Sequence, residues 1–178
     1  MEKITKALQY NWYAVYIRSR AEKKAQNELQ LAGIETFLPL QRKLRQWSDR
    51  KKWVEMPLIP GYLFVKISRK EYDPVLYSTY VVSYVKFEGA AAIIQEKQID
   101  FLKLMLKQDN LDIEITQEKL EPGQTIEVIA GPLIGLQGKL IRIKGKNKVA
   151  IQLEQLGYSA LIEILTEDIH VIKPSANE

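Results

Sequence analysis

A polar run at residues 108–120 separates two stretches of the chain that differ in their patterns of glycine and apolar residues. The acidic side chains of this run are spaced without a helix or strand period: Asp109, Asp112, Glu114 and Glu118. Such a composition is typical of the segments that connect domains. The sequence therefore predicts a first domain at residues 1–107, a linker at residues 108–120 and a second domain at residues 121–178.

The first stretch mixes predicted helices with predicted strands. Ser19 and Glu22 have the spacing of a capping box, which predicts that a helix begins there. The buried stripe of this helix is expected at four positions: Ala21, Ala25, Leu29 and Ala32. Asp73 followed by Pro74 predicts a second, short helix, and apolar side chains at helical spacing predict a third over residues 95–107.

Runs of apolar and β-branched side chains predict strands at four places in this stretch: residues 12–17, 34–40, 63–67 and 81–87. Strands that alternate with helices in this order favour an α+β fold, in which helices flank an antiparallel sheet.

The second stretch holds six of the nine glycines of the chain, at positions 123, 131, 135, 138, 145 and 157. They lie between or next to five short apolar runs: residues 125–130, 139–143, 149–153, 160–165 and 169–172. Short strands separated by glycine turns are typical of a small β-barrel.

Composition limits the chemistry that the chain can perform. It has no cysteine and a single histidine, His170, so disulfides and thiolate metal sites are excluded and an imidazole-based site has little scope. Carboxylates such as Glu35 and Glu55 have no partner at a spacing that suggests catalysis. We therefore expect neither an enzyme nor a cofactor. The first nine residues lack an apolar core and no run approaches the roughly 18 apolar residues of a membrane span, so we expect a cytoplasmic protein without a membrane segment.

The basic residues are concentrated at the N-terminal end of the chain. Residues 1–70 contain 15 Lys or Arg against 6 Asp or Glu, whereas residues 71–178 contain 11 against 16. Residues 41–52 alone hold six basic side chains and one acid, and are expected to form an extended hairpin with residues 53–58. This arm is either a solvated β-hairpin or a nucleic-acid contact, and Trp47 and Trp53 either pack across it or stack on a base.

A turn at Pro60 and Gly61 connects the basic arm to the strand at residues 63–67. Because side chains alternate along a strand, Tyr62 and Phe64 share one face of the sheet. Leu63 and Val65 point to the other face, which we expect the helices to cover.

Several motifs resemble signatures of the NusG family. Three resemble the signature strands of its N-terminal domain: Trp12-Tyr13-Ala14-Val15, Ile59-Pro60-Gly61-Tyr62-Leu63-Phe64-Val65 and Val82-Ser83-Tyr84-Val85-Lys86-Phe87. Three more resemble the KOW module: Glu121-Pro122-Gly123-Gln124-Thr125-Ile126-Glu127-Val128, Gly131-Pro132-Leu133 and Gly138-Lys139-Leu140. The resemblance covers nearly the whole chain. It implies a NusG-type N-terminal antiparallel sheet with flanking helices, followed by a small SH3-like β-barrel. The chain is most similar to specialised paralogues that act as antiterminators on long surface-polysaccharide operons.

The resemblance implies that the first domain binds the clamp helices of the largest subunit of RNA polymerase. The residues at the matching positions are Tyr16, Ile59, Pro60, Tyr62 and Phe64. A few large side chains in a groove suit the docking of an amphipathic helix. Four basic residues match positions that face upstream or non-template DNA in related antiterminators: Arg18, Arg20, Lys23 and Lys24. Glu28 stands where a sequence-specific relative has a DNA-reading side chain, so base readout is not carried over.

For the second domain, the resemblance implies ribosomal protein S10 or the termination factor Rho as partner. The matching loops hold Leu133, Leu136, Leu156 and Gly157, where exposed apolar groups would indicate a binding surface and buried ones simple barrel packing. We expect a monomer that works as a transcription elongation and antitermination factor. A ribosome-associated RNA-binding protein is the alternative, because KOW barrels also occur in ribosomal proteins and the basic arm suits RNA.

Overall fold

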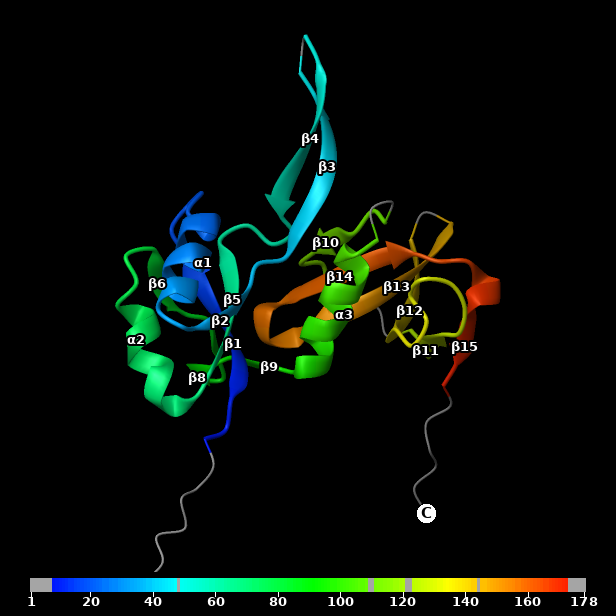
Figure 1. Cartoon of the computed structure of the whole chain (residues 1–178). Coiled ribbons are helices and arrows are strands. Elements are labelled where there is room, and N and C mark those ends of the chain that lie inside the picture. The colour runs from blue at the N-terminus through cyan, green and yellow to red at the C-terminus, as the bar shows by residue number, and fades with distance from the viewer. Residues whose placement is uncertain (1–7, 48, 109–110, 121–122, 144, 173–178) are drawn as a thin grey trace, which may run out of the picture. The chain divides into compact units, whose positions relative to one another are not determined.

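The structure is a computed structural model, and it describes residues 8–47, 49–108, 111–120, 123–143 and 145–172. By its internal contacts the chain divides into two compact units, Met1–Glu96 and Lys97–Glu178, which are described one at a time (Figure 1). The contacts thus place the division after the first residue of the helix at residues 96–106, whereas the sequence predicts that this helix belongs to the first domain. The predicted limits at residues 107 and 120 remain predictions.

Unit 1 is built on an antiparallel sheet with strand order β2-β5-β1-β6, and β9 also pairs with β1. These strands are β1 (Asn11–Ile17), β2 (Glu35–Phe37), β5 (Tyr62–Ile67), β6 (Val81–Tyr84) and β9 (Ile93–Ile94). The helices are α1 (Glu22–Leu31) and α2 (Tyr72–Leu76), the second preceded by a 3₁₀ turn, η1 (Arg69–Glu71). Two further strand pairs are β3 (Leu40–Gln46) with β4 (Lys51–Pro57), and β7 (Lys86–Phe87) with β8 (Ala90–Ala91). The β3–β4 hairpin extends away from the sheet of this unit (Figure 1).

One face of the sheet forms a core with α1. Leu63 and Val65 belong to the same buried cluster as Ala25 and Leu29 of the helix. The prediction from strand alternation is therefore confirmed, since these two side chains lie on the helix side. Ala32 is exposed because α1 ends at Leu31, so the predicted stripe is one residue too long.

The predicted capping box at Ser19 and Glu22 is wrong. The N-cap of α1 is Ala21, with no side-chain hydrogen bond, and Arg20 before it has a positive φ of 59°. The Glu22 carboxylate instead accepts a hydrogen bond from the backbone N–H of Gly61. The local sequence pattern predicts that the Glu22 carboxylate binds a backbone N–H at the start of α1. In the fold it binds the N–H of Gly61 instead, which is distant in the sequence.

The predicted start of α2 at Asp73 and Pro74 is also too late. A capping box forms earlier, where the Glu71 carboxylate accepts hydrogen bonds from the backbone N–H and the hydroxyl of Ser68 at 2.8 and 2.7 Å. This box starts η1, which runs directly into α2 at Tyr72. The first turn of α2 then contains Asp73, where a negative charge is favourable, and Pro74, whose missing N–H costs nothing there.

Unit 2 contains α3 (Glu96–Leu106), apart from its first residue, and an antiparallel sheet with strand order β10-β14-β13-β12-β11-β15. These strands are β10 (Glu114–Thr116), β11 (Thr125–Val128), β12 (Gln137–Ile143), β13 (Lys146–Leu153), β14 (Tyr158–Glu163) and β15 (Ile169–Val171). All five predicted strands of the second stretch are present. In α3, the Gln98 side chain donates a hydrogen bond of 2.7 Å to the Gln152 carbonyl of β13.

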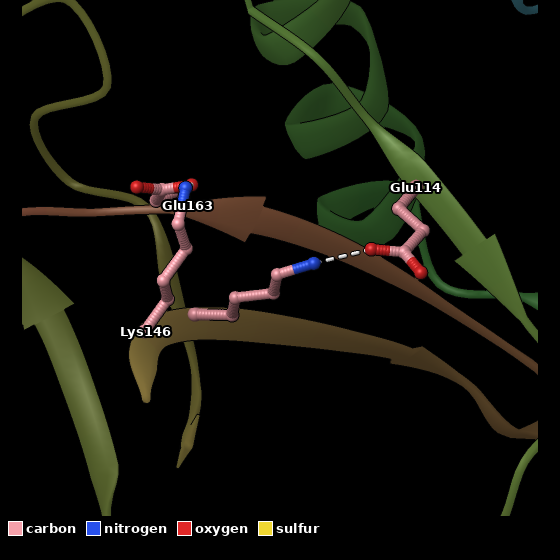
Figure 2. Close-up of polar contacts among 4 residues, drawn as sticks. Glu114, Lys146 and Glu163 are labelled. Carbon is pink, nitrogen blue, oxygen red and sulfur yellow. Dashed lines mark hydrogen bonds and ion pairs between the residues drawn. The ribbon is translucent and has the colours of Figure 1, made fainter. Parts of the chain in front are cut away.

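Strand β10 lies within the segment that the sequence analysis expects to be a linker. It pairs with β14 through Glu114, Ile115 and Thr116. The Glu114 carboxylate forms an ion pair with Lys148 of β13, and Lys146 pairs with Glu163 of β14 at 2.8 Å (Figure 2). A strand of three residues is too short to show an alternation of apolar and polar side chains, and β10 is held by backbone pairing with β14 and by one ion pair. This explains why the sequence does not predict it.

Candidate interaction surfaces

The turn at Pro60 and Gly61 is fixed to both β1 and α1. Gly61 has a φ of 80°, a left-handed conformation that favours glycine. Its carbonyl accepts a hydrogen bond of 2.8 Å from the Ile17 N–H, and its own N–H donates to the Glu22 carboxylate at 2.9 Å. Pro60 is exposed at the surface of this turn. The fold therefore presents Pro60 on a backbone that is held from two sides.

The face of the sheet opposite α1 carries aromatic side chains. Tyr16 and Tyr62 are cross-strand partners whose ring centroids lie 5.0 Å apart. Phe64 stacks against Phe37 of β2 at 6.0 Å. Of the five residues predicted to bind polymerase, Tyr16 and Pro60 are exposed, the former at 39%, whereas Ile59, Tyr62 and Phe64 are buried. The structure thus brings all five to the turn and the adjoining strands, and leaves two of them open to contact.

The four basic residues predicted to bind nucleic acid lie at the exit of β1 and in the first turn of α1, and all are exposed: Arg18, Arg20, Lys23 and Lys24. Ala21 N–H donates to the Arg18 carbonyl at 3.0 Å, which closes the turn between the two elements. Lys23 forms an ion pair of 2.9 Å with Glu55 of β4, and the hydrogen bond from this lysine lowers the pKa of the Glu55 carboxyl. The four cations therefore form one local group, in which Lys23 already has an acidic partner.

Glu28 is tied to the segment after α2. Its carboxylate accepts hydrogen bonds from the Ser78 hydroxyl and, at 3.2 Å, from the Thr79 N–H. The bond from Ser78 is the main reason why the pKa of Glu28 lies below its ordinary value. These contacts give Glu28 a structural role between α1 and the start of β6.

The basic arm forms the predicted hairpin. Trp47 and Trp53 are 44% and 53% exposed, so neither ring is packed into a core. Trp53 lies opposite Leu44 in the ladder, and the Arg42 guanidinium lies over its ring at 5.7 Å from the centroid. Packing across the hairpin is present for Trp53, but it leaves half of the ring available.

The turn residues of unit 2 are more buried than a binding surface requires. Leu133 and Leu136 are 6% and 0% exposed, and the loop that holds them folds back on β11 through hydrogen bonds such as Gly135 N–H to the Val128 carbonyl. Leu156, in the turn after β13, is 8% exposed. Gly157 is exposed, with a φ of 69°. Two large apolar side chains of the loop after β11 are exposed, Ile129 at 51% and Ile134 at 64%, and neither is among the binding residues predicted from the sequence. Ile134 lies between two turn glycines and two leucines, which was a signal available in the sequence.

Among the residues that the structure describes, no group of three or more His, Asp or Glu side chains is placed to hold a metal ion. None of the described helices has both the length and the apolar character to cross a bilayer.

Comparison with known proteins identifies the family of the first stretch. The family model described as "Transcription termination factor nusG" matches residues 10–103, which is more than half of the chain. Among solved structures, the chain is similar to NusG of Thermotoga maritima, with 18% identity and a TM-score of 0.49 over 93% of this chain and 98% of that one. It also matches a chain of the MjSpt4:Spt5 complex, with 18% identity and a TM-score of 0.29 over 93% and 99% of the two chains.

Proposed function

Since the chain belongs to the NusG family, we propose that it is a transcription elongation and antitermination factor that binds RNA polymerase through its first domain. The family consists of transcription factors rather than enzymes. The observation that carries the proposal is the exposed side chain of Tyr16, which lies against Tyr62 on the sheet face opposite α1, together with the exposed Pro60 in the turn that leads into β5.

The proposed polymerase site comprises Tyr16, Ile59, Pro60, Tyr62 and Phe64, and its target is the clamp-helix pair of the largest subunit. Tyr16 and Pro60 offer contact area directly, and a tyrosine adds a polar group that suits the rim of a helix interface. Ile59 and Phe64 are buried, so in the structure they offer no surface of their own. Binding across the cleft would help to keep the clamp closed and so favour elongation.

The proposed nucleic-acid site is the group Arg18, Arg20, Lys23 and Lys24, which would face upstream or non-template DNA. All four side chains are exposed, and the N-terminus of α1 adds its own partial positive charge. Contacts of this kind bind phosphates and do not depend on base sequence.

The second unit is proposed to form a KOW domain, an SH3-like barrel built from strands β11–β15, that recruits ribosomal protein S10 or Rho. The candidate surface is the pair of loops at residues 133–136 and 156–157. The exposed side chain of Ile134 offers an apolar contact on this surface. Leu133, Leu136 and Leu156 are buried beneath the loops and would act by holding their conformation.

The experiment that tests the function maps polymerase occupancy along the genome with and without the protein, in cells where it is expressed. A specialised antiterminator raises occupancy in the distal part of one or a few long operons. Uniform change over all genes would contradict the specialised role. Cosedimentation with ribosomes in the absence of polymerase would instead support the RNA-binding alternative.

A further inference from the structure

The β3–β4 hairpin has two faces of different composition. Alternation along the paired strands places Arg42, Leu44, Lys51 and Trp53 on one face. The other face carries Lys43, Arg45 and Lys52. Glu55, on the first of these faces, is the sole acid in the two strands, which are described in full.

The arrangement of charge on the second face is unfavourable for the hairpin alone. Arg45 and Lys52 are direct cross-strand partners, and Lys43 is the diagonal neighbour of Lys52. Like charges directly opposite one another destabilise a strand pair. The side chains of Arg45 and Lys52 are exposed, so the repulsion between these two direct partners is screened by solvent but not removed. An anionic ligand that spans these cations would offset it.

The first face offers a platform for an aromatic ligand. Trp53 is 53% exposed and lies two residues from Lys51 on the same face of β4. Arg42 contributes a second cation, whose guanidinium lies over this ring at 5.7 Å from its centroid. A second indole, that of Trp47, is 44% exposed at the tip. The packing of Trp53 across the hairpin leaves its side chain about half exposed, and two exposed indoles among cations suit a ligand that has both phosphates and flat rings.

We propose that the β3–β4 hairpin is a binding site for single-stranded nucleic acid, with one base stacked on Trp53 and phosphates held by Lys51, Lys52 and Arg45. Lys52 and Trp53 are consecutive residues that point to opposite faces of a two-stranded ribbon. A strand that passes around the open edge of β4 therefore reaches both. In a duplex the bases are already stacked on one another, so the exposed indoles would gain little.

This site is separate from the group at the start of α1, and binding to it does not require polymerase. Its test uses the full chain and labelled oligonucleotides of about 12 nucleotides, since such sites cover roughly 4–16. Fluorescence anisotropy compares oligo-dT, oligo-U and a mixed-sequence DNA duplex over a range of salt. Tighter binding of either single strand than of the duplex is expected, and the two single strands show whether DNA or RNA is preferred. Preference for the duplex would overturn the proposal.

The phosphate contacts are tested by the triple variant Arg45→Gln, Lys51→Gln, Lys52→Gln, which removes the three cations of the proposed site. Its control is Lys70→Gln, Lys86→Gln, Lys107→Gln, which removes the same charge from exposed lysines elsewhere. Each lost phosphate contact should reduce the slope of log K against log salt by about 0.7, so the triple variant should lose up to about 2. The hairpin should remain folded because the variant relieves the repulsion between Arg45 and Lys52. Equal slopes in the two triple variants would overturn the proposal.

The stacking contact is tested by Trp53→Ala, which should weaken single-strand binding about 5- to 100-fold and leave duplex binding unchanged. Trp53→Phe retains a ring and should recover much of the affinity, which separates stacking from loss of the hairpin. Tyr77→Ala is the control, because Tyr77 is 81% exposed elsewhere in unit 1. If Trp53→Ala binds oligo-dT and oligo-U as the unaltered chain does, the hairpin is a solvated arm.

Discussion

The Glu22 carboxylate accepts a hydrogen bond of 2.9 Å from the backbone N–H of Gly61, which lies 39 residues further along the chain. Glu22 is only 8% exposed, so the bond is shielded from water. It ties the first turn of α1, which carries Lys23 and Lys24, to the turn that presents Pro60. One buried carboxylate therefore holds the proposed DNA-binding and polymerase-binding groups in a fixed relation within unit 1.

Replacing Glu22 with alanine should lower the stability of the first unit and weaken polymerase binding. A buried N–H without its charged partner costs about 1–3 kcal/mol, which chemical denaturation measures. Without this bond the turn that holds Pro60 is less well fixed, so binding to a clamp-helix fragment should weaken, by up to about tenfold, because part of the binding free energy is spent on ordering the turn.

Glu22→Gln is the matched variant, because its amide oxygen can still accept from Gly61. It should retain most of the binding, whereas Glu35→Ala, at an exposed position of β2, should change neither quantity. If Glu22→Gln is as defective as Glu22→Ala, the carboxylate acts through its charge and not through this hydrogen bond.

The basic group at the exit of β1 should contribute phosphate contacts. The double variant Arg18→Gln, Arg20→Gln should reduce the slope of log K against log salt for duplex DNA by up to about 1.8, and should weaken binding to all sequences alike. The double variant Lys86→Gln, Lys107→Gln removes equal charge elsewhere and is the control. A loss confined to one DNA sequence would show base readout, contrary to the assignment.

The contact of Glu28 with Ser78 predicts a pH dependence of stability. The pKa of Glu28 in the folded chain lies below its ordinary value of 4.5, mainly because of this bond. The contribution to stability is therefore fully present above that value and is lost as pH falls through the folded-state pKa. Denaturation curves between about pH 6 and about pH 3 should show a smaller decline for Ser78→Ala than for the unaltered chain. Parallel declines would mean that other carboxylates dominate.

The ion pair of Lys148 with Glu114 should anchor β10 only weakly. The Glu114 side chain is 56% exposed, so the coupling energy from a double-mutant cycle with Glu114→Gln and Lys148→Gln should be about 0–1 kcal/mol. The same cycle for Lys146 and Glu163, both about 60% exposed, is the comparison. A coupling well above 1 kcal/mol would show that the pair, and not strand pairing, holds β10.

Several features of unit 1 could be predicted because they depend on the residues of one short stretch of sequence. Alternation along β5 suffices to place Leu63 and Val65 against α1, and the charge pattern suffices to predict the β3–β4 hairpin. The five strands of the second stretch follow from apolar runs between glycines.

The features that the sequence does not reveal depend on distant partners. Glu22 has the spacing of a capping residue, and only the tertiary approach of Gly61 shows its use. Ser68 and Glu71 form the capping box of the turn that leads into α2. The sequence predicted the helix start at Asp73 and Pro74 instead, because these two residues match the usual residue types of a helix N-terminus more clearly. The burial of Leu133 and Leu136, with Ile134 between them exposed, depends on how the loop folds back on β11.

The most direct test of the central claim measures binding of the full chain to a fragment that carries the polymerase clamp helices. Titration calorimetry at low and at high salt gives the dissociation constants. The proposed interface is mainly apolar, so binding should persist at high salt. Tyr16→Ala, at 39% exposure, should weaken it about tenfold or more. The control Tyr77→Ala should bind as the unaltered chain does. Absence of salt-resistant binding, or equal affinities of the two variants, would contradict the account.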